Sequence, residues 1–276
     1  MPLFFGQQLM NSGSWLPCLC MFFAFCLAAS GIYCLNDVCD AEADRNHPEK
    51  CTRPIARGAV SSKTAYVVMA ACWLSSFGFV ALGCSADMQV AMKAAAILGL
   101  YIVMNIAYCL KLKNFSIVDV FIVAIGFVLR VLIGGVIAGI ALSQWLVLMT
   151  FLLALFIGFA KRRDDVLTYK SSGEKMRKNV GSYNIQFINN ALCIMASITI
   201  VCYIMYTVSE EVVQRIGSPY LYTTSVFVIA GILRYLQIAI VEEKSGSPTK
   251  VMLRDRFIEF CVAAWILTFA CILYIN

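Results

Sequence analysis

The sequence from Trp15 to Asp44 reads WLPCLCMFFAFCLAASGIYCLNDVCDAEAD. Its first part, residues 15–36, is long and apolar enough to cross a bilayer as a helix, because a transmembrane helix needs about 20 mainly apolar residues. Three aspartates follow, Asp37, Asp40 and Asp44, at the point where the apolar helix meets a basic loop. The stretch therefore predicts a membrane helix whose end carries an acidic cluster.

The composition extends this prediction to the whole chain. Of 276 residues, 61% are hydrophobic and only 14% are charged, whereas soluble domains carry roughly a quarter charged residues. A bilayer excludes open sheet edges, so the fold class is all-α, a polytopic transmembrane helical bundle in one domain, residues 1–276. A short apolar stub at 2–10 is too short to cross. We expect eight full spans, near residues 15–36, 63–84, 88–110, 116–141, 143–160, 186–208, 219–241 and 257–275.

The basic residues predict the orientation of these spans. Four connecting segments carry 18 of the 22 lysines and arginines, namely 37–63, 111–114, 161–185 and 242–256. Cytoplasmic loops of membrane proteins are enriched in these residues, so the four segments and the acidic cluster are predicted to face the cytosol. The same loops account for the net charge of +6, and no nucleic-acid partner is needed to explain it.

The aspartate spacing favours a metal site. At 100° per residue, Asp37, Asp40 and Asp44 fall within about 60° of one another on one helical face, while Glu42 points away. Clustered carboxylates repel unless a cation lies between them. Oxygen ligands that leave room for water and substrate phosphate are typical of Mg²⁺ sites, so we interpret the trio as a Mg²⁺-diphosphate site. A solvated acidic helix end is the alternative.

The loop after the aspartates adds three cations. Lys50, Arg53 and Arg57 lie in a segment that mixes basic residues with proline and glycine, which suits an ordered loop over the mouth of the bundle. Their side chains would clamp phosphate oxygens in that arrangement. Ordinary positive-inside charge explains them equally well, and both interpretations stay open.

Polar residues also lie within the predicted spans. Asn105, Tyr108 and Lys111 form a strip near one cytoplasmic helix end, for which interhelical hydrogen bonding is an alternative to substrate binding. Arg130 and Arg234 are costly to place in lipid, so we expect both to face the interior of the bundle.

A second basic cluster opens the loop after residue 160. Lys161 and Arg162 lie at the membrane surface, where the phosphate of a lipid head group would sit. The neighbouring Asp164 and Asp165 are adjacent and therefore point to different helix faces, which makes a second metal site there weaker. A stop-transfer flank is the alternative interpretation of this charge run.

These strings resemble a known family. The run Asn36-Asp37-x-x-Asp40-x-x-x-Asp44 resembles the first aspartate-rich motif of the UbiA prenyltransferase superfamily. The similarity extends through NDVCDAEADRNHPEKCTRPIARG, FVLRVLIGG, the KR at 161–162, RK with a later Tyr183, LRY and SPTKVMLRDR. Together these strings look like the polyprenyl-phosphate (decaprenyl-phosphate) phosphoribosyltransferase branch.

The resemblance implies a UbiA-type bundle, with nine helices in the family, and a multi-pass protein of the bacterial cytoplasmic membrane whose active site faces the cytosol. The implied reaction is transfer of 5-phosphoribose from phosphoribosyl diphosphate to a polyprenyl phosphate, with Mg²⁺ held by the catalytic aspartates. Lys161 and Arg162 would then position the lipid phosphate. The resemblance also nominates four further substrate-binding residues, namely Asn36, Arg177, Lys178 and Tyr183.

Two departures from the family accompany the match. Members that use aromatic acceptors carry a second DxxxD motif where this chain reads KRRDD, which favours an acceptor that bears a phosphate. Members of the branch usually begin with a basic RPxQWxKN-like segment, whereas this chain begins MPLFF. We therefore expect a partial first helix, and an N-terminally shortened chain.

Other functions remain open on the sequence. One alternative is a prenyltransferase that uses a prenyl diphosphate donor and an aromatic or quinone acceptor. A second is a transporter or lipid-binding scaffold, although transporters commonly place their site at midmembrane between repeats, whereas these aspartates lie at a cytosolic edge. The expected partners are the membrane, a polyprenyl phosphate and phosphoribosyl diphosphate, and homo-oligomerisation is left open.

Overall fold

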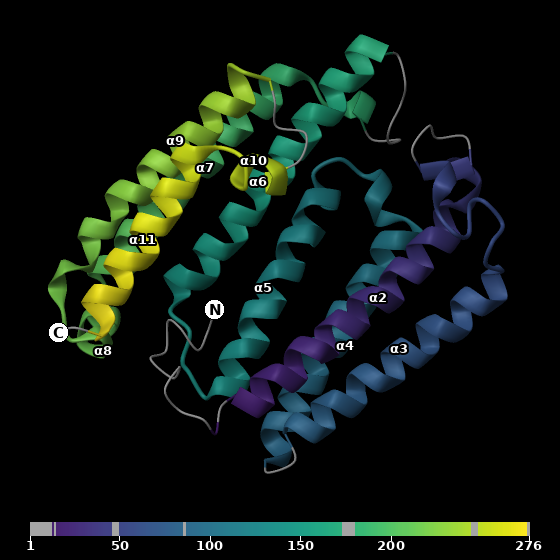
Figure 1. The fold of residues 1–276 in the computed structure, drawn as a ribbon, viewed down its shortest axis with the longest axis horizontal. Helices are drawn as coiled ribbons and strands as arrows, with labels where there is room; N and C mark the ends of the chain where they lie inside the picture. The colour runs from purple at the N-terminus through teal and green to yellow at the C-terminus, as the bar shows by residue number, and fades with distance from the viewer. Residues whose placement is uncertain are drawn as a thin grey trace. The chain divides into compact units, whose positions relative to one another are not determined.

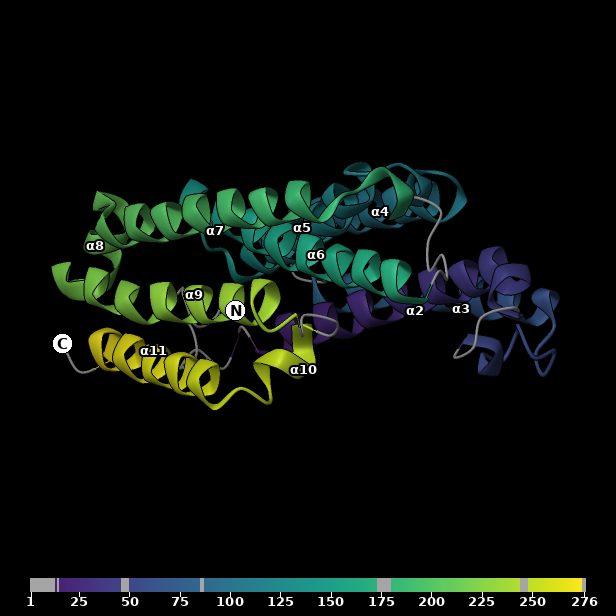
Figure 2. The same cartoon turned by 90° about the horizontal axis from the view of Figure 1, so that it is seen from above.

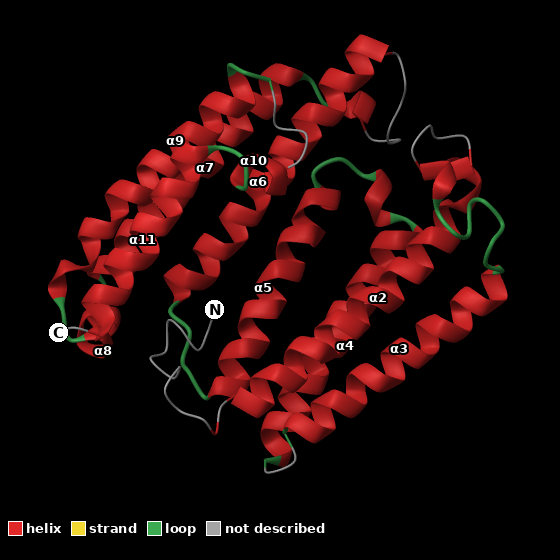
Figure 3. Cartoon of the chain, viewed as in Figure 1, coloured by secondary structure: helices red, strands yellow, loops and turns green. Residues whose placement is uncertain are grey.

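A computed structural model describes residues 13, 15–45, 50–84, 87–172, 180–243 and 248–274. The described residues form helices joined by loops and turns, with no strand among them (Figure 3). Eight of the helical segments are long and apolar enough to span a membrane. The predicted stub at 2–10 lies outside the described residues. The all-α polytopic fold is confirmed for the part of the chain that can be compared.

The elements follow one another along the chain (Figure 1). The long helices are α2 (Trp15–Arg45), α3 (Ser62–Gly83), α4 (Met88–Leu110), α5 (Val118–Ala138), α6 (Gln144–Ser172), α7 (Ile185–Val208), α9 (Ser225–Ile240) and α11 (Arg256–Tyr274). The short elements are η2 (Lys50–Thr52), η3 (Leu112–Asn114), η4 (Val180–Ser182), α8 (Glu210–Ile216), η5 (Pro219–Thr224) and α10 (Pro248–Met252).

The predicted spans agree with these helices, with two instructive differences. Helix α2 continues nine residues beyond the predicted membrane boundary to Arg45, and α6 continues from residue 160 to Ser172. The apolar run sets where a span ends, whereas the helix itself ends where its backbone hydrogen bonds end. The aspartates of residues 37–44 and the charged run at 161–165 are consequently part of helices rather than of loops.

The chain divides into two compact units. The first comprises Met1–Lys113 with Leu129–Ala141, and the second comprises Asn114–Val128 with Leu142–Asn276. Helix α5 contributes to both, because its first half packs in the core of the second unit and its second half in the core of the first.

In the first unit, α2 packs along α3 and also contacts α4 (Figure 1). The approach of α2 to α3 is close at Gly31, where an added Cβ would lie 2.4 Å from the indole Nε1 of Trp73. The same indole donates a hydrogen bond of 3.3 Å to the carbonyl of Ala28. A side chain at Gly31 would separate the two helices, so this glycine helps to place the acidic end of α2.

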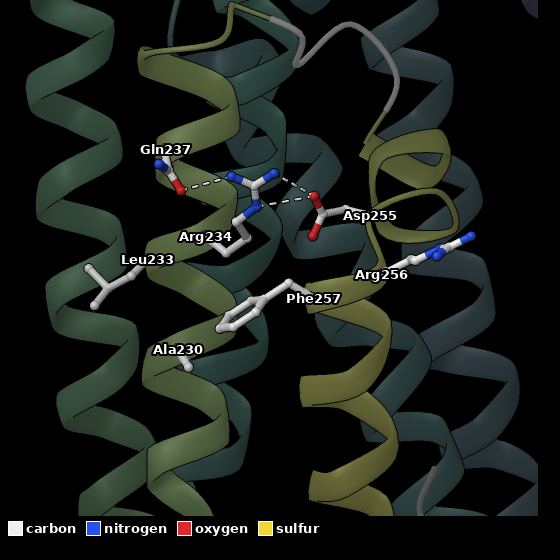
Figure 4. A pocket seen from close by; sticks show the side chains of 7 residues that line it. All are labelled: Ala230, Leu233, Arg234, Gln237, Asp255, Arg256 and Phe257. Carbon is white, nitrogen blue, oxygen red and sulfur yellow. Dashed lines mark hydrogen bonds and ion pairs between the residues drawn. The ribbon is translucent and has the colours of Figure 1, made fainter.

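In the second unit, α7 packs against α6 and α9, and α9 packs against α11; the view from above separates these helices (Figure 2). An open groove of about 800 Å³ runs between α9 and the start of α11. Arg234 and Asp255 face each other across one end of it, while Arg256 points away from that pair (Figure 4). Apolar side chains line the rest of the groove, namely Ala230, Leu233 and Phe257.

The position of Arg234 explains how a charge is accommodated in a predicted span. Its guanidinium donates two hydrogen bonds, of 3.1 and 2.7 Å, to Asp255 Oδ2, and lies 2.8 Å from Glu242. Asp255 also accepts a hydrogen bond from the backbone N–H of Ile258, which caps the N-terminus of α11. The arginine therefore anchors the start of the last long helix.

A pH dependence of stability follows from this pair. The hydrogen bonds from Arg234 hold the pKa of Asp255 below its ordinary value of 3.8. The folded-state pKa lies below the unfolded one, so this contribution to the free energy of unfolding is complete above about pH 5 and is lost as the pH falls through 3.8 and below. Asparagine caps helices as well as aspartate does, so Asp255→Asn isolates the charge. The difference in thermal midpoint between wild type and variant should shrink on acidification; a constant difference from pH 6 to pH 3 would contradict this account.

Candidate active site

The acidic end of α2 is built around a shared cation. Arg53, which directly follows η2, places Nη1 2.9 Å from Asp37 Oδ1 and 2.9 Å from Asp44 Oδ2. Asp37 and Asp44 therefore lie on one face of α2, two helical turns apart, as their spacing predicts. The side chain of Asp44 is only 6% exposed, and a buried carboxylate of this kind needs its counter-ion.

A second cation holds the third aspartate. Lys113, the middle residue of η3, places Nζ 2.5 Å from Asp40 Oδ1 and 3.4 Å from the amide oxygen of Asn36. Arg45 at the end of α2 donates a hydrogen bond to the carbonyl of Ala56 and so ties the loop after η2 to the helix. The structure thus brings the acidic motif, the first basic loop and the α4–α5 connection together within the first unit.

The three carboxylates are not gathered around one point. Among the described residues, no group of three or more His, Cys, Asp or Glu is arranged to hold a metal ion, because Arg53 bridges two of the aspartates and Lys113 holds the other. The donor chemistry nevertheless fits Mg²⁺, which prefers carboxylate and carbonyl oxygens. The side chains of Arg53 and Lys113 already contact these oxygens, so positive charge is accommodated at this position.

The other candidate substrate-binding residues of the first unit lie after α2 and at the end of α4. Lys50 begins η2 and is half-buried, whereas Arg57 is exposed beside Gly58. Gly58 has a φ of +78°, a conformation that glycine adopts without the steric cost of a side chain. Tyr108 is half-buried on α4, and Lys111 is exposed at the C-terminus of that helix. The polar strip predicted at the end of α4 is therefore accessible.

A second charged cluster lies in the second unit, on the part of α6 that follows residue 160. Arg162 is 4% exposed, and its guanidinium lies 2.7 Å from Asp119 Oδ2 and 2.9 Å from Asp165 Oδ2. Asp119 sits in the first turn of α5, where the helix dipole favours a negative charge. Lys161 is exposed on the same helix. Arg162 is buried between two carboxylates and Lys161 is exposed, a difference that the adjacent positions of two basic residues in the sequence do not indicate.

Tyr183 completes this buried cluster. Its hydroxyl donates to Asp119 Oδ1 over 3.3 Å and accepts a hydrogen bond from the backbone N–H of Ile117. Burial raises the pKa of Tyr183 to about 12, the backbone bond from Ile117 opposing part of that rise, so the hydroxyl stays protonated at physiological pH. Ile117 has a φ of +68°, which costs a β-branched residue on the order of 1–3 kcal/mol. Tyr183 thus holds a strained backbone turn just before α5.

Arg163, the next residue of α6, has other partners than Arg162. Arg163 is 2% exposed, and its Nε donates a hydrogen bond of 2.8 Å to Asn189 on α7. Its Nη2 contacts Glu243 and the carbonyl of Ile240. These contacts tie α6 to α7 and to the end of α9, and they point to a role in packing.

Two of the predicted site residues, Arg177 and Lys178, lie outside the described residues. Sequence reasoning missed Lys113, Asp119 and the strained Ile117. The pair of lysines in the short 111–114 connection was the only signal for Lys113, whereas Asp119 stands in an apolar span with no local signal.

Comparison with known proteins identifies related sequences. The sequence profile of the UbiA prenyltransferase family matches residues 1–260. The chain is 34% identical to the decaprenyl-phosphate phosphoribosyltransferase of Mycolicibacterium smegmatis, over 92% of this chain and 80% of that protein. It is 33% identical to the enzyme of the same name from Corynebacterium glutamicum, over 92% of this chain and 75% of that protein.

Solved structures show the same fold. A UbiA homologue from Archaeoglobus fulgidus, bound to DMAPP and Mg²⁺, superposes with a TM-score of 0.71 over 99% of this chain and 93% of that chain, at 17% sequence identity. The same homologue bound to GPP and Mg²⁺ also gives a TM-score of 0.71, at 18% identity, over 98% of this chain and 92% of that chain. At this level of identity the likeness concerns the fold.

Proposed function

Because this chain belongs to the UbiA prenyltransferase family, we propose that it transfers 5-phosphoribose from phosphoribosyl diphosphate to a polyprenyl phosphate and releases diphosphate. It is an integral membrane protein and a transferase. The observation that carries the proposal is 34% identity, over 92% of the chain, to a decaprenyl-phosphate phosphoribosyltransferase. The reaction breaks the bond between ribose C1 and the diphosphate oxygen, and forms one between C1 and an oxygen of the lipid phosphate.

We assign the donor to the acidic end of α2. Asp37, Asp40 and Asp44, with the amide oxygen of Asn36, would hold Mg²⁺, which neutralises the charge of the departing diphosphate when it is bound. The contacts of the aspartates with Arg53 and Lys113 support this assignment, because each aspartate has a cation within 2.9 Å of a carboxylate oxygen and positive charge is therefore accommodated there. The two cations would move from the carboxylates to diphosphate oxygens when the donor binds.

Further cations of the first unit would complete the donor site. Lys50 and Arg57 come from the loop after α2, and Tyr108 and Lys111 come from the end of α4. Arginine offers two parallel hydrogen bonds to a phosphate, whereas lysine contributes a compact charge. Phosphoribosyl diphosphate carries more negative charge than one Mg²⁺ can neutralise, and the three aspartates add to that negative charge. The surplus of basic residues would offset the remainder.

The acceptor needs cations rather than a base. A lipid phosphate is already anionic, so no proton has to be removed before it attacks ribose C1. We propose that Lys161, exposed on α6 just after its apolar part, positions this phosphate, together with Arg177 and Lys178, which follow in the sequence. The motif KRRDD, in place of a second DxxxD, agrees with an acceptor that supplies its own charge.

We further propose that both units form one transferase domain in a bacterial cytoplasmic membrane, with the basic loops in the cytosol. Helix α5 supports the first part because it is shared by both cores. The asymmetry of lysine and arginine between alternate loops supports the second.

A donor competition assay tests the function. Proteoliposomes that contain the full chain are supplied with Mg²⁺, polyprenyl phosphate and an aromatic acceptor, together with labelled phosphoribosyl diphosphate or labelled prenyl diphosphate. We expect the ribose label to enter the lipid fraction and the prenyl label to stay in the donor. Prenyl label in the aromatic acceptor, with none of the ribose label in lipid, would establish the prenyltransferase alternative instead.

A further inference from the structure

The three consecutive cations of α6, Lys161, Arg162 and Arg163, which lie where the apolar part of the helix ends, have different environments. Arg162 lies between the carboxylates of Asp119 and Asp165, and Arg163 contacts Glu243. Lys161 is exposed. The guanidinium charge of Arg162 is therefore matched inside the protein, and Lys161 is the member of the run whose charge reaches the surface.

The contacts of Arg162 fix α6 against the beginning of α5. Gly158 lies one turn before Arg162, and a Cβ at Gly158 would come within 2.4 Å of the side chain of Val120. Asp119, next to Val120 in sequence, receives the guanidinium of Arg162 on the same side of α6. Two contacts one helical turn apart set both the position and the rotation of α6 where Lys161 projects.

Tyr183 closes the same cluster from the segment before α7. Its hydroxyl bonds both the carboxylate of Asp119 and the N–H of Ile117, whose φ of +68° places it in the left-handed region. Such strain persists only where surrounding structure maintains it, and it concentrates at functional sites. A buried ion pair is also a weak device for stability, because apolar residues of similar volume often stabilise as well or better.

We propose that Asp119 and Tyr183 are positioning residues, which hold Arg162 and thereby place Lys161 for contact with the acceptor phosphate. The inference rests on the proposed function and refines it. Arg162 and Tyr183 act from inside the protein rather than as direct ligands of the substrate. Polyprenyl phosphate binding is accordingly sensitive to buried groups that the lipid does not touch.

The test compares Asp119→Asn and Tyr183→Phe with wild type in proteoliposomes of the full chain. The KM for polyprenyl phosphate should rise about tenfold or more in both variants, since a supporting contact commonly affects function by 10- to 100-fold. The KM for phosphoribosyl diphosphate should change by less than about twofold. Tyr203→Phe is the matched control, because it also removes a buried tyrosine hydroxyl of the second unit that is hydrogen-bonded to Thr224 and Trp265; its KM values should stay unchanged.

A double variant separates positioning from stability. Asp119→Asn with Arg162→Gln removes the charges of both members of this pair and leaves Asp165, whose side chain is 12% exposed, as the remaining carboxylate, so part of the thermal stability lost in Arg162→Gln should return. If the residues position Lys161, the KM for polyprenyl phosphate stays raised. Recovery of a wild-type KM together with stability, or single variants that lower only the amount of folded protein, would overturn the inference.

A binding measurement keeps this inference distinct from the proposed reaction. The affinity of each purified variant for fluorescent polyprenyl phosphate is measured without donor or metal. Weaker binding by Asp119→Asn and Tyr183→Phe than by wild type supports the positioning role, and equal binding refutes it. Absence of phosphoribosyl transfer by wild type would refute the reaction alone, since the binding comparison does not depend on turnover.

Discussion

Replacing Asp37 with asparagine is expected to lower the turnover number for phosphoribosyl transfer by on the order of 10³-fold. A metal that neutralises a leaving diphosphate contributes several kcal/mol to the stabilisation of the transition state, and each 1.4 kcal/mol is a factor of ten in rate. Asp37 and Asp44 meet at one guanidinium, so the change removes charge from the centre of the site. The measurement is single-turnover transfer from labelled phosphoribosyl diphosphate to polyprenyl phosphate.

The folded state should survive this substitution. The side chain of Asp37 is 28% exposed, and partly exposed ion pairs contribute roughly 1 kcal/mol or less to stability. Glu42→Gln is the matched control, because Glu42 is an exposed carboxylate on the same helix outside the predicted metal-binding face. Turnover reduced equally by the two changes would mean that the acidic face has no special part in the reaction.

Replacing Arg162 with glutamine is expected to produce the largest loss of stability, about 3–5 kcal/mol. The change leaves Asp119, whose side chain is 0% exposed, without the guanidinium 2.7 Å from its carboxylate. Removing one partner of a buried ion pair costs far more stability than replacing both partners by apolar residues, because a desolvated charge stays behind. Thermal unfolding of the purified protein in detergent measures the effect.

The comparison is with Arg53→Gln, which removes another arginine that bridges two carboxylates. The side chains of Arg53 and Asp37 are 35% and 28% exposed, so water can solvate Asp37, whereas the nearly buried Asp44 loses its counter-ion. The loss of stability for Arg53→Gln should therefore be smaller than that for Arg162→Gln, which leaves two buried carboxylates, Asp119 and Asp165. A loss for Arg162→Gln no greater than that for Arg53→Gln would contradict the view that Arg162 compensates the buried carboxylates of Asp119 and Asp165.

Local sequence information accounts for the spans and for one face of the acidic helix. The apolar run before Asn36 predicted α2, and helical periodicity placed Asp37 and Asp44 on one side of it, since both properties depend on neighbours within a few residues. Arg53 was predicted as a phosphate-binding residue from the basic loop that follows the aspartates. It contacts Asp37 and Asp44, which precede it by only 16 and 9 residues.

Contacts between distant segments were beyond the reach of such reasoning. Lys113 meets Asp40 across 73 residues, and Asp119 meets Arg162 across 43, so each pair exists only because of how the helices pack. The run at 161–165 has the composition of a stop-transfer flank, which conceals that Arg162 is buried. A positive φ at Ile117 contradicts its local preference and becomes explicable only through the hydroxyl of Tyr183.

Binding of Mn²⁺ in place of Mg²⁺ tests most directly whether the aspartates of α2 hold a metal with the diphosphate donor. Electron paramagnetic resonance of the purified chain, with and without phosphoribosyl diphosphate, counts the bound ions. We expect one donor-dependent site in wild type that is retained in Glu42→Gln and lost in the double variant Asp37→Asn, Asp40→Asn. The same stoichiometry and affinity in that double variant as in wild type would contradict the account.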